Sequence, residues 1–205
     1  MTEKFTVYLV DDDPGVLKAL SRLLRAKGHD VKPYSSPQVF LEEHDVAVPG
    51  CVVLDVSMPG LDGLEIQRVL TAASGYHRPV VFVTGKGDIP TSVRAMKAGA
   101  IDFLTKPVKD KDLFEAVSRA EARDAELRRL HSEMESVQAK VSNLTPRERE
   151  VLTHVVAGRL NKQIAGDLGT VEKTIKVHRS RMMEKLGIRM VADLVRMAEK
   201  LNLSK

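Results

Sequence analysis

Three acidic side chains in the first third of the chain stand where short apolar runs end. Asp11 and Asp12 follow the run Phe5 to Val10, and Asp55 ends the run Cys51 to Asp55. If these runs are neighbouring parallel strands, their carboxyl ends meet at one edge of a sheet, and the three carboxylates converge there. Close carboxylates repel one another unless a cation lies between them, and a hard, oxygen-ligated ion such as Mg²⁺ fits this chemistry. We therefore expect a magnesium site at this edge.

Two further polar side chains occupy the same position on later apolar runs. Thr84 ends the run Pro79 to Thr84, and Lys106 follows the run Ile101 to Thr105. These two residues add a hydroxyl and an ammonium group to the same edge. A carboxylate attacks a phosphoryl donor when cations and hydrogen-bond donors balance the charge that develops on phosphorus. These residue types therefore favour phosphoryl transfer to a carboxylate. Pro107 follows Lys106, and the sequence leaves the isomer of that peptide bond open.

Simpler roles are open for several of these residues. Asp13, immediately before Pro14, is expected to serve only as the N-terminal cap of a helix, and Asp11 to Asp13 taken alone allow that interpretation. Phe103, taken alone, is more often a core residue than a functional one. The segment Gly85-Lys86-Gly87 lacks the spacing of a phosphate-binding loop.

A scaffold of alternating strands and helices must position these side chains, and the first 120 residues have that pattern. The apolar runs predict strands, and the amphipathic stretches between them predict helices on both faces of a parallel sheet. The short connections favour an α/β flavodoxin-like fold with five strands in the order 2-1-3-4-5. The predicted strands are Phe5 to Val10, His29 to Tyr34, Cys51 to Asp55, Pro79 to Thr84 and Ile101 to Thr105. The predicted helices are Pro14 to Lys27, Gln38 to His44, Gly63 to Ala73 and Ile89 to Ala98.

One long helix is expected to connect this unit to the rest of the chain. The stretch from Asp112 to about Ser142 contains no proline, no glycine and no strand pattern. Apolar residues recur in it at alternating spacings of three and four, which fits either a short coiled-coil seam with a second copy or a stripe packed on its own domain. These residues are Leu127, Leu130, Met134, Val137, Val141 and Leu144.

The end of the chain is basic and helical. From Val141 onwards there are 13 Lys and Arg residues against 7 Asp and Glu, whereas the preceding part has a net charge of −2. This asymmetry favours contact of the C-terminal part with a polyanion, although a charged surface is often only solvated. Thr145 and Thr170 are expected to cap helices there. The four predicted helices are Pro146 to Ala157, Lys162 to Leu168, Val171 to Leu186 and Val191 to Leu203.

The third of these helices has two unlike faces. At 100° per residue, Ile175, Met182 and Leu186 fall on one inner stripe. Lysine amines and a small apolar side chain suit the edges of guanine and thymine in a major groove, so we expect the opposite face to contact DNA. The residues of that face are Lys173, Lys176, Val177, Ser180 and Arg181. The flanking residues expected to contact phosphates are Lys162, Arg179 and Lys185.

The first part of the chain resembles the receiver domain of bacterial response regulators. The motifs are Val10-Asp11-Asp12-Asp13, Leu54-Asp55-Val56-Ser57-Met58-Pro59-Gly60, Val83-Thr84-Gly85 and Phe103-Leu104-Thr105-Lys106-Pro107. The resemblance implies that Asp55 is the phospho-acceptor, and that Mg²⁺ is held by Asp11, Asp12, Asp55 and the backbone carbonyl of Ser57. It also implies that Lys106 is the phosphate partner, that Thr84 and Phe103 are a switch pair, and that the fourth helix and fifth strand form a dimerisation face.

The last part resembles the four-helix DNA-binding domain of LuxR-type regulators. The segments that carry this are Leu144-Thr145-Pro146-Arg147-Glu148, Asn161-Lys162-Gln163-Ile164-Ala165 and Thr174-Ile175-Lys176-Val177-His178. The whole chain therefore resembles the FixJ and NarL class, and the FixJ branch most closely. The implied organisation is a receiver at residues 4–120, a helical linker at 121–142 and a helix-turn-helix domain at 143–205. The implied partners are a sensor histidine kinase, double-stranded DNA, RNA polymerase and, on phosphorylation, a second copy.

Two other functions fit parts of the sequence. An enzyme with an aspartyl-phosphate intermediate would use Asp55 but leaves the C-terminal domain unexplained, so we expect no enzyme. A DNA-binding regulator that is never phosphorylated would use only that domain. The chain has no apolar run long enough to cross a bilayer, no signal-peptide pattern at its start and a single cysteine, Cys51, so we expect a cytoplasmic protein without membrane contact.

Overall fold

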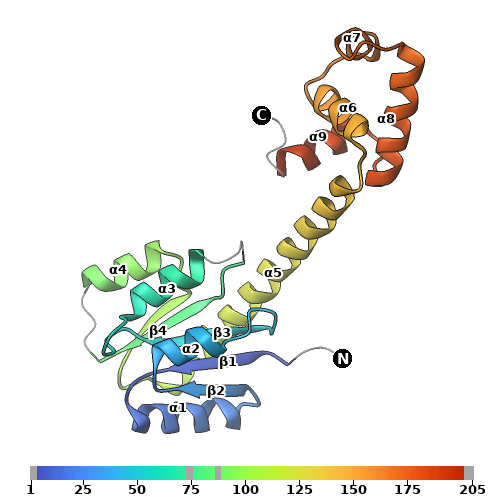
Figure 1. The fold of residues 1–205 in the computed structure, drawn as a ribbon. Helices are drawn as coiled ribbons and strands as arrows, with labels where there is room; N and C mark the ends of the chain where they lie inside the picture. Colours follow the sequence, from blue (N-terminus) through green and yellow to red (C-terminus); the bar gives the residue numbers. More distant parts are fainter. Residues whose placement is uncertain (1–3, 73–75, 86–88, 201–205) are drawn as a thin grey trace. The chain divides into compact units, whose positions relative to one another are not determined.

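The structure, a computed structural model, describes residues 4–72, 76–85 and 89–200 (Figure 1). The chain divides into two compact units, Met1–Arg129 and Leu130–Lys205. Each unit has its own hydrophobic core. The predicted helix ends at Ala73 and Leu203 and the segment Lys86-Gly87 lie outside the described residues.

The described residues of the first unit form a five-stranded parallel sheet in the order β2-β1-β3-β4-β5, as predicted (Figure 1). Each strand ends at its predicted residue, whereas each start differs from the prediction by one residue. The ends are marked in the sequence by polar residues, but the starts depend on pairing with neighbouring strands. The strands are β1 (Thr6–Val10), β2 (Asp30–Tyr34), β3 (Gly50–Asp55), β4 (Val80–Thr84) and β5 (Asp102–Thr105).

Helices cover both faces of this sheet. α1 and α5 pack on one face, where Leu24 and Leu113 are fully buried. α2, α3 and α4 pack on the other face, where Phe40 and Ile66 are fully buried. Asp13 caps the first helix as predicted, since its carboxylate accepts hydrogen bonds from the next turn. The helices are α1 (Pro14–Ala26), α2 (Pro37–Glu43), α3 (Gly63–Ala72), α4 (Ile89–Lys97) and α5 (Asp110–Ser142).

A buried hydrogen-bond network, which the sequence analysis did not identify, fixes part of α5 to the first unit. Asp124 is only 2% exposed and accepts hydrogen bonds from the Tyr76 hydroxyl and from Arg128. Arg128 also donates to the carbonyl oxygens of residues 46–48. Its guanidinium lies 4.7 Å from the centre of the Tyr76 ring. The network therefore holds α5 against the loop that precedes β3.

The apolar stripe of the long helix divides into two parts. Val137 and Val141 pack against the core of the second unit, and Leu144 is buried there. For these three residues the structure supports the simpler interpretation, a stripe packed on its own domain. Leu130 and Met134 are 41% and 49% exposed. A seam with a second copy stays a prediction for these two residues.

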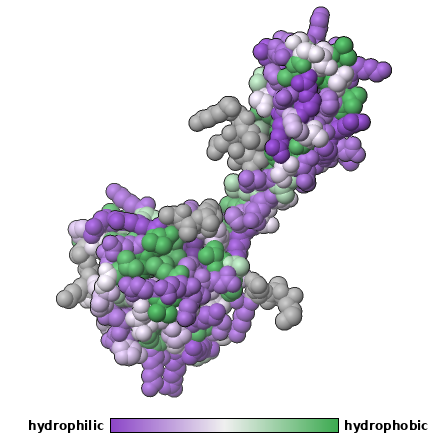
Figure 2. All heavy atoms as spheres, viewed as in Figure 1, coloured by the Kyte–Doolittle hydropathy of each residue, from purple (hydrophilic) through white to green (hydrophobic). Residues whose placement is uncertain are grey.

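The described residues of the second unit contain four short helices after α5, as predicted (Figure 1). Their core includes Ile164, Ile175 and Met182, which are fully buried. The helices are α6 (Pro146–Val156), α7 (Asn161–Asp167), α8 (Glu172–Leu186) and α9 (Val191–Lys200). Hydrophilic side chains cover most of the visible face of both units (Figure 2). Among the helices that the structure describes, none is both long enough and apolar enough to cross a lipid bilayer.

One of the two predicted threonine caps is correct and one is wrong. Thr145 forms a capping box with Glu148, in which each side chain bonds to the backbone N–H of the other residue. Thr170 does not cap α8, because its backbone N–H donates to the Ala165 carbonyl and holds it in the turn after α7. Val171 is the N-cap instead, and its side chain makes no capping hydrogen bond.

Replacing Val171 with serine should stabilise α8. A serine hydroxyl at an N-cap accepts a hydrogen bond that valine cannot accept, and the difference is about 1 kcal/mol. Amide hydrogen exchange of the full chain, resolved to peptides of α8, should show slower exchange. Val177→Ser is the matched control, because Val177 lies within the same helix, where the two residue types have similar helix propensity. Equal exchange in Val171→Ser and the wild type would contradict the prediction.

Candidate functional site

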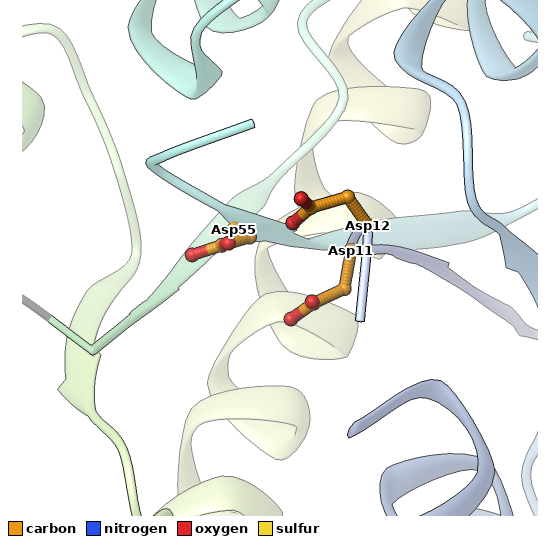
Figure 3. A group of neighbouring side chains, drawn as sticks. All are labelled: Asp11, Asp12 and Asp55. Carbon is orange, nitrogen blue, oxygen red and sulfur yellow. The ribbon is translucent and has the colours of Figure 1, made fainter. Parts of the chain in front are cut away.

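The structure brings the three carboxylates of the first unit together. Asp11 and Asp12 follow β1, and Asp55 ends the neighbouring strand β3. The register pairs Val10 with Leu54, so the three residues lie at the same edge of the sheet (Figure 3). Carboxylate oxygens of the three residues lie within 4.8 Å of one another. Asp11 and Asp55 are buried and Asp12 is exposed. The group is therefore an acidic pocket, open to solvent at Asp12.

Lys106 brings a positive charge into this acidic pocket. Its ammonium group lies 2.6 Å from Asp11 Oδ2 and 3.5 Å from Asp55 Oδ2. The Lys106–Pro107 peptide bond, which the sequence left open, is cis. The backbone N–H of Lys106 donates to the Thr84 carbonyl at 2.7 Å, which ties the end of β5 to the end of β4.

Burial and neighbouring charges shift the pKa values of Asp55 and Lys106. Burial raises the pKa of Asp55, and the nearby charge of Asp11 raises it further, whereas Lys106 and a hydrogen bond from the Ser57 backbone oppose this rise. Burial acts to lower the pKa of Lys106, but the hydrogen bond from its ammonium to Asp11 and the two carboxylate charges together raise that pKa above its ordinary value. Lys106 therefore stays charged at neutral pH and can pair with a further anion.

The acidic pocket offers the ligands that a hard divalent cation prefers. Its donor atoms are carboxylate oxygens, which suit Mg²⁺ better than a softer metal. Within the described residues, Asp55 Oδ1 is buried and has no hydrogen-bond partner. A buried carboxylate oxygen without a partner is costly unless a cation or donor meets it. The residues present therefore fit a bound Mg²⁺ ion.

The expected switch residues lie on β4, which pairs with the strand that carries Asp55, and on β5, which pairs with β4. Thr84 is fully buried at the end of β4. Phe103 lies in β5, is half-buried and packs against the core on the face covered by α3 and α4. Its ring centre lies 6.1 Å from that of Phe82 on β4. The structure thus places one hydroxyl and one aromatic ring on adjacent strands at this side of the pocket.

Gly63, next to the acidic pocket, has a packing role that the sequence did not indicate. A Cβ atom at Gly63 would lie 2.5 Å from the backbone oxygen of Asp55 and 3.1 Å from the Val56 Cα atom. The start of α3 therefore packs directly against the chain segment that carries Asp55, and only glycine allows this approach. Asp62-Gly63 has the composition of a turn, but the sequence does not show which backbone the glycine contacts.

The residues expected to contact DNA lie on an exposed surface of the second unit. Ile175, Met182 and Leu186 are buried, as the helical periodicity predicts. The opposite face of α8 is exposed to solvent. The exposed residues among those expected to contact DNA are Lys162, Lys173, Lys176, Val177, Ser180 and Arg181.

Two residues expected to contact phosphates also have partners within the chain. Lys185 Nζ lies 2.7 Å from a carboxylate oxygen of Glu148, which is 2% exposed. Arg179 donates a hydrogen bond of 2.9 Å to Asn161. Both contacts join α8 to the helices packed against it, so they give Lys185 and Arg179 a structural role that the sequence analysis did not foresee.

Comparisons with known proteins match both units. The family model for the response regulator receiver domain matches residues 7–118, and that for bacterial regulatory proteins of the luxR family matches residues 142–198. Nodulation protein W of Bradyrhizobium diazoefficiens is 41% identical over 201 residues, which cover 98% of this chain and 88% of that protein. Transcriptional regulatory protein FixJ of Azorhizobium caulinodans is 41% identical over 201 residues, which cover 97% of this chain and 93% of that protein.

Two solved structures of similar length resemble the whole chain. The response regulator StyR is 45% identical, with a TM-score of 0.79 over 96% of this chain and 99% of that one. Full-length FixJ from B. japonicum is 36% identical, with a TM-score of 0.57 over 98% of this chain and 99% of that one. The similarity therefore extends through both units and the helix between them.

Proposed function

The chain belongs to the response regulators that join a receiver domain to a LuxR-type DNA-binding domain, and we propose that phosphorylation of Asp55 controls its binding to DNA. The observation that carries this proposal is the position of Asp55 in the acidic pocket, buried beside Asp11 and 3.5 Å from Lys106. We place the receiver at residues 4–120, the linker at 121–142 and the DNA-binding domain at 143–205. Since DNA is the target, we propose a cytoplasmic location.

The phosphoryl donor is a phosphohistidine of a sensor kinase, which the receiver domain implies as partner. A carboxylate oxygen of Asp55 forms a bond to phosphorus while the phosphorus–nitrogen bond breaks, and the leaving imidazole takes up a proton from water. Asp11, Asp12, Asp55 and the Ser57 carbonyl would hold Mg²⁺, which balances the charge on the phosphoryl oxygens. Lys106, which now pairs with Asp11, turns its ammonium group to a phosphoryl oxygen.

The added anion then changes the surface of the receiver. The Thr84 hydroxyl donates to a phosphoryl oxygen, and Phe103 rotates into the space that Thr84 leaves. These movements alter the face formed by α4 and β5, where a second copy binds. The resulting homodimer presents two DNA-binding domains, and on DNA it contacts RNA polymerase. The buried position of Thr84 and the half-buried position of Phe103 on adjacent strands support this switch.

Treatment of the full chain with Mg²⁺ and a small phosphodonor such as acetyl phosphate tests the proposal. We expect a slowly decaying adduct of one phosphoryl group per chain, visible by mass spectrometry, together with tighter binding to DNA. Continuous release of phosphate without an adduct would instead indicate an enzyme. An adduct that leaves DNA affinity unchanged would indicate a regulator that works independently of phosphorylation.

Asp12→Asn should weaken magnesium binding. The substitution removes one anionic ligand from the acidic pocket. Loss of a residue that only hydrogen-bonds to a metal ligand typically weakens metal affinity by about tenfold or more, so loss of a direct ligand should have at least this effect. The magnesium concentration that gives half the maximal phosphorylation rate should rise accordingly. Asp13→Asn is the control, because Asp13 only caps α1 and asparagine caps equally well. The same magnesium requirement in both variants would remove Asp12 from the site.

Lysines that contact DNA phosphates should contribute to the salt dependence of DNA affinity. Lys173→Gln or Lys162→Gln should weaken binding to DNA of any sequence and reduce the slope of log affinity against log salt by about one. Substitution of Lys176 or Val177 should instead change which sequence is preferred. Arg196→Gln in α9 is a control that removes an exposed charge with an intrahelical partner. An unchanged slope for Lys173→Gln would exclude its contact with a phosphate.

A further inference from the structure

An acidic residue borders the face of α8 that is proposed to contact DNA, at the N-terminal end of the helix. Glu172 is the first residue of α8, and its Oε1 atom lies 3.0 Å from the ammonium group of Lys176, one turn further along. The two side chains are 46% and 63% exposed. The ion pair therefore lies on the surface, at the part of the helix that enters the groove first in helix-turn-helix proteins.

This pair adds little stability, although Glu172 also lies in the first turn of α8, where a carboxylate is favourable. An exposed ion pair between residues four apart contributes only about 0.3–0.5 kcal/mol. A carboxylate among DNA-facing lysines also repels phosphates, so it opposes the attraction that the basic surface provides. We therefore consider a role of the Glu172–Lys176 pair in the discrimination between specific and non-specific DNA.

Lys176 needs such a constraint if it reads a base. A lysine ammonium is a compact point charge on a flexible stem, with three donors that can meet a phosphate as readily as a base edge. Glu172 restricts this freedom, because one ammonium proton points to Oε1 and the remaining donors point away from Glu172. A phosphate approaching the same ammonium would meet the carboxylate charge, whereas guanine O6 and N7 carry no net charge.

We propose that Glu172 is a specificity-determining residue, which positions Lys176 for a guanine edge in the major groove and keeps it from neutralising a phosphate. This inference rests on the proposed DNA contacts of α8. It assigns to Glu172 a role through Lys176 rather than a direct contact with DNA.

Glu172→Gln should therefore raise non-specific affinity while it lowers discrimination. In the variant, Lys176 becomes free to meet a phosphate, so binding to a non-specific duplex should strengthen and its salt slope should steepen by about one. The ratio of specific to non-specific affinity should fall on the order of tenfold, the scale of one base contact. Glu184→Gln is the matched control, since Glu184 is an exposed residue of the same helix.

The experiment compares the full-length wild type with Glu172→Gln, Glu184→Gln, Lys176→Gln and the Glu172→Gln/Lys176→Gln double variant, each treated with Mg²⁺ and acetyl phosphate. The probes are a duplex selected by the wild type from random-sequence DNA and a scrambled duplex of the same composition, each measured at several salt concentrations. We expect the effect of Glu172→Gln to disappear in the Lys176→Gln background. Equal effects of Glu172→Gln and Glu184→Gln, or an effect that persists without Lys176, would overturn the inference.

The proposed function fails in a different way. If the phosphorylated wild type selects no duplex from random-sequence DNA and does not bind the scrambled one, the proposed DNA contacts of α8 are wrong, and the role of Glu172 is overturned with them. If the wild type prefers the selected duplex and Glu172→Gln keeps both the preference and the salt slope, only the inference about Glu172 is overturned.

Discussion

Asp55→Asn is expected to reduce phosphoryl uptake from acetyl phosphate by at least about a hundredfold and to remove the effect of the phosphodonor on DNA affinity. Asparagine has nearly the shape of aspartate, but its amide lacks the anionic oxygen that attacks phosphorus. Asp11, the other buried carboxylate of the pocket, is occupied by the Lys106 ammonium at 2.6 Å. It is therefore poorly placed to act as the acceptor.

Mass spectrometry of the intact chain, read at intervals after addition of the phosphodonor, measures this uptake. Asp62→Asn is a suitable control, because the exposed Asp62 accepts the Glu65 backbone N–H at the start of α3 and asparagine can accept it equally. The control should take up one phosphoryl group at the wild-type rate. If Asp55→Asn still gains one group at that rate, the acceptor is another residue and the proposed switch is wrong.

The sequence was sufficient to predict the acidic pocket because its geometry follows from topology. Parallel strands place their carboxyl ends at one edge, so a polar residue that ends an apolar run is positioned as soon as the strand order is known. Asp11 and Asp55 belong to this class, and so do Thr84 and Lys106. The same reasoning explains why all five strand ends were predicted correctly and the strand starts were each displaced by one residue.

Contacts between distant segments could not be predicted, because no local pattern encodes them. Arg128 reaches carbonyl oxygens about 80 positions earlier in the chain, and Tyr76 reaches Asp124. Arginine and aspartate in an amphipathic helix are usually solvated, so periodicity alone gave no reason to expect a buried network. Gly63 is similar, since its tight approach to Asp55 depends on how α3 meets the sheet.

The wrong cap shows where local rules fail. Thr170 has the residue type of an N-cap, but the Ala165 carbonyl holds its backbone in the turn after α7, and the helix begins one position later. For Lys185, the sequence predicts a phosphate contact but does not indicate its partner within the chain. Its partner Glu148 lies 37 residues earlier and is buried against it.

That ion pair makes Glu148 the position in the second unit where a conservative change should have the largest effect. Glu148 is 2% exposed and accepts hydrogen bonds from Lys185 at 2.7 Å and from the Thr145 backbone at 2.9 Å. Glu148→Gln keeps the shape but removes the charge, which leaves the Lys185 ammonium without its anion. Because Lys185 is 38% exposed, water compensates in part, and we expect a loss of roughly 1–3 kcal/mol in the stability of the second unit.

The same pair gives the second unit a dependence on acid. The hydrogen bond from Lys185 lowers the pKa of Glu148 below its ordinary value of 4.5, and bonds to Thr145 act in the same direction, although burial opposes them. An acid with a depressed pKa stabilises the folded state above its ordinary pKa, and this stability is lost as the pH falls through the folded value. The wild type should therefore lose stability below about pH 4.5, whereas Glu148→Gln should lack this part of the pH dependence.

Hydrogen exchange of α6 and α8 amides in the full chain, corrected for the intrinsic effect of pH on exchange, measures both effects. Glu150→Gln is the matched control, since Glu150 is 50% exposed and pairs with Arg147 within the same helix. An exposed pair of this kind contributes about 0.2–1 kcal/mol, so protection should change little. If Glu148→Gln and Glu150→Gln behave alike, the buried carboxylate is not what joins α6 to α8. The contact between α6 and α8 would then depend mainly on the apolar core, which includes Val151, Ile175 and Met182.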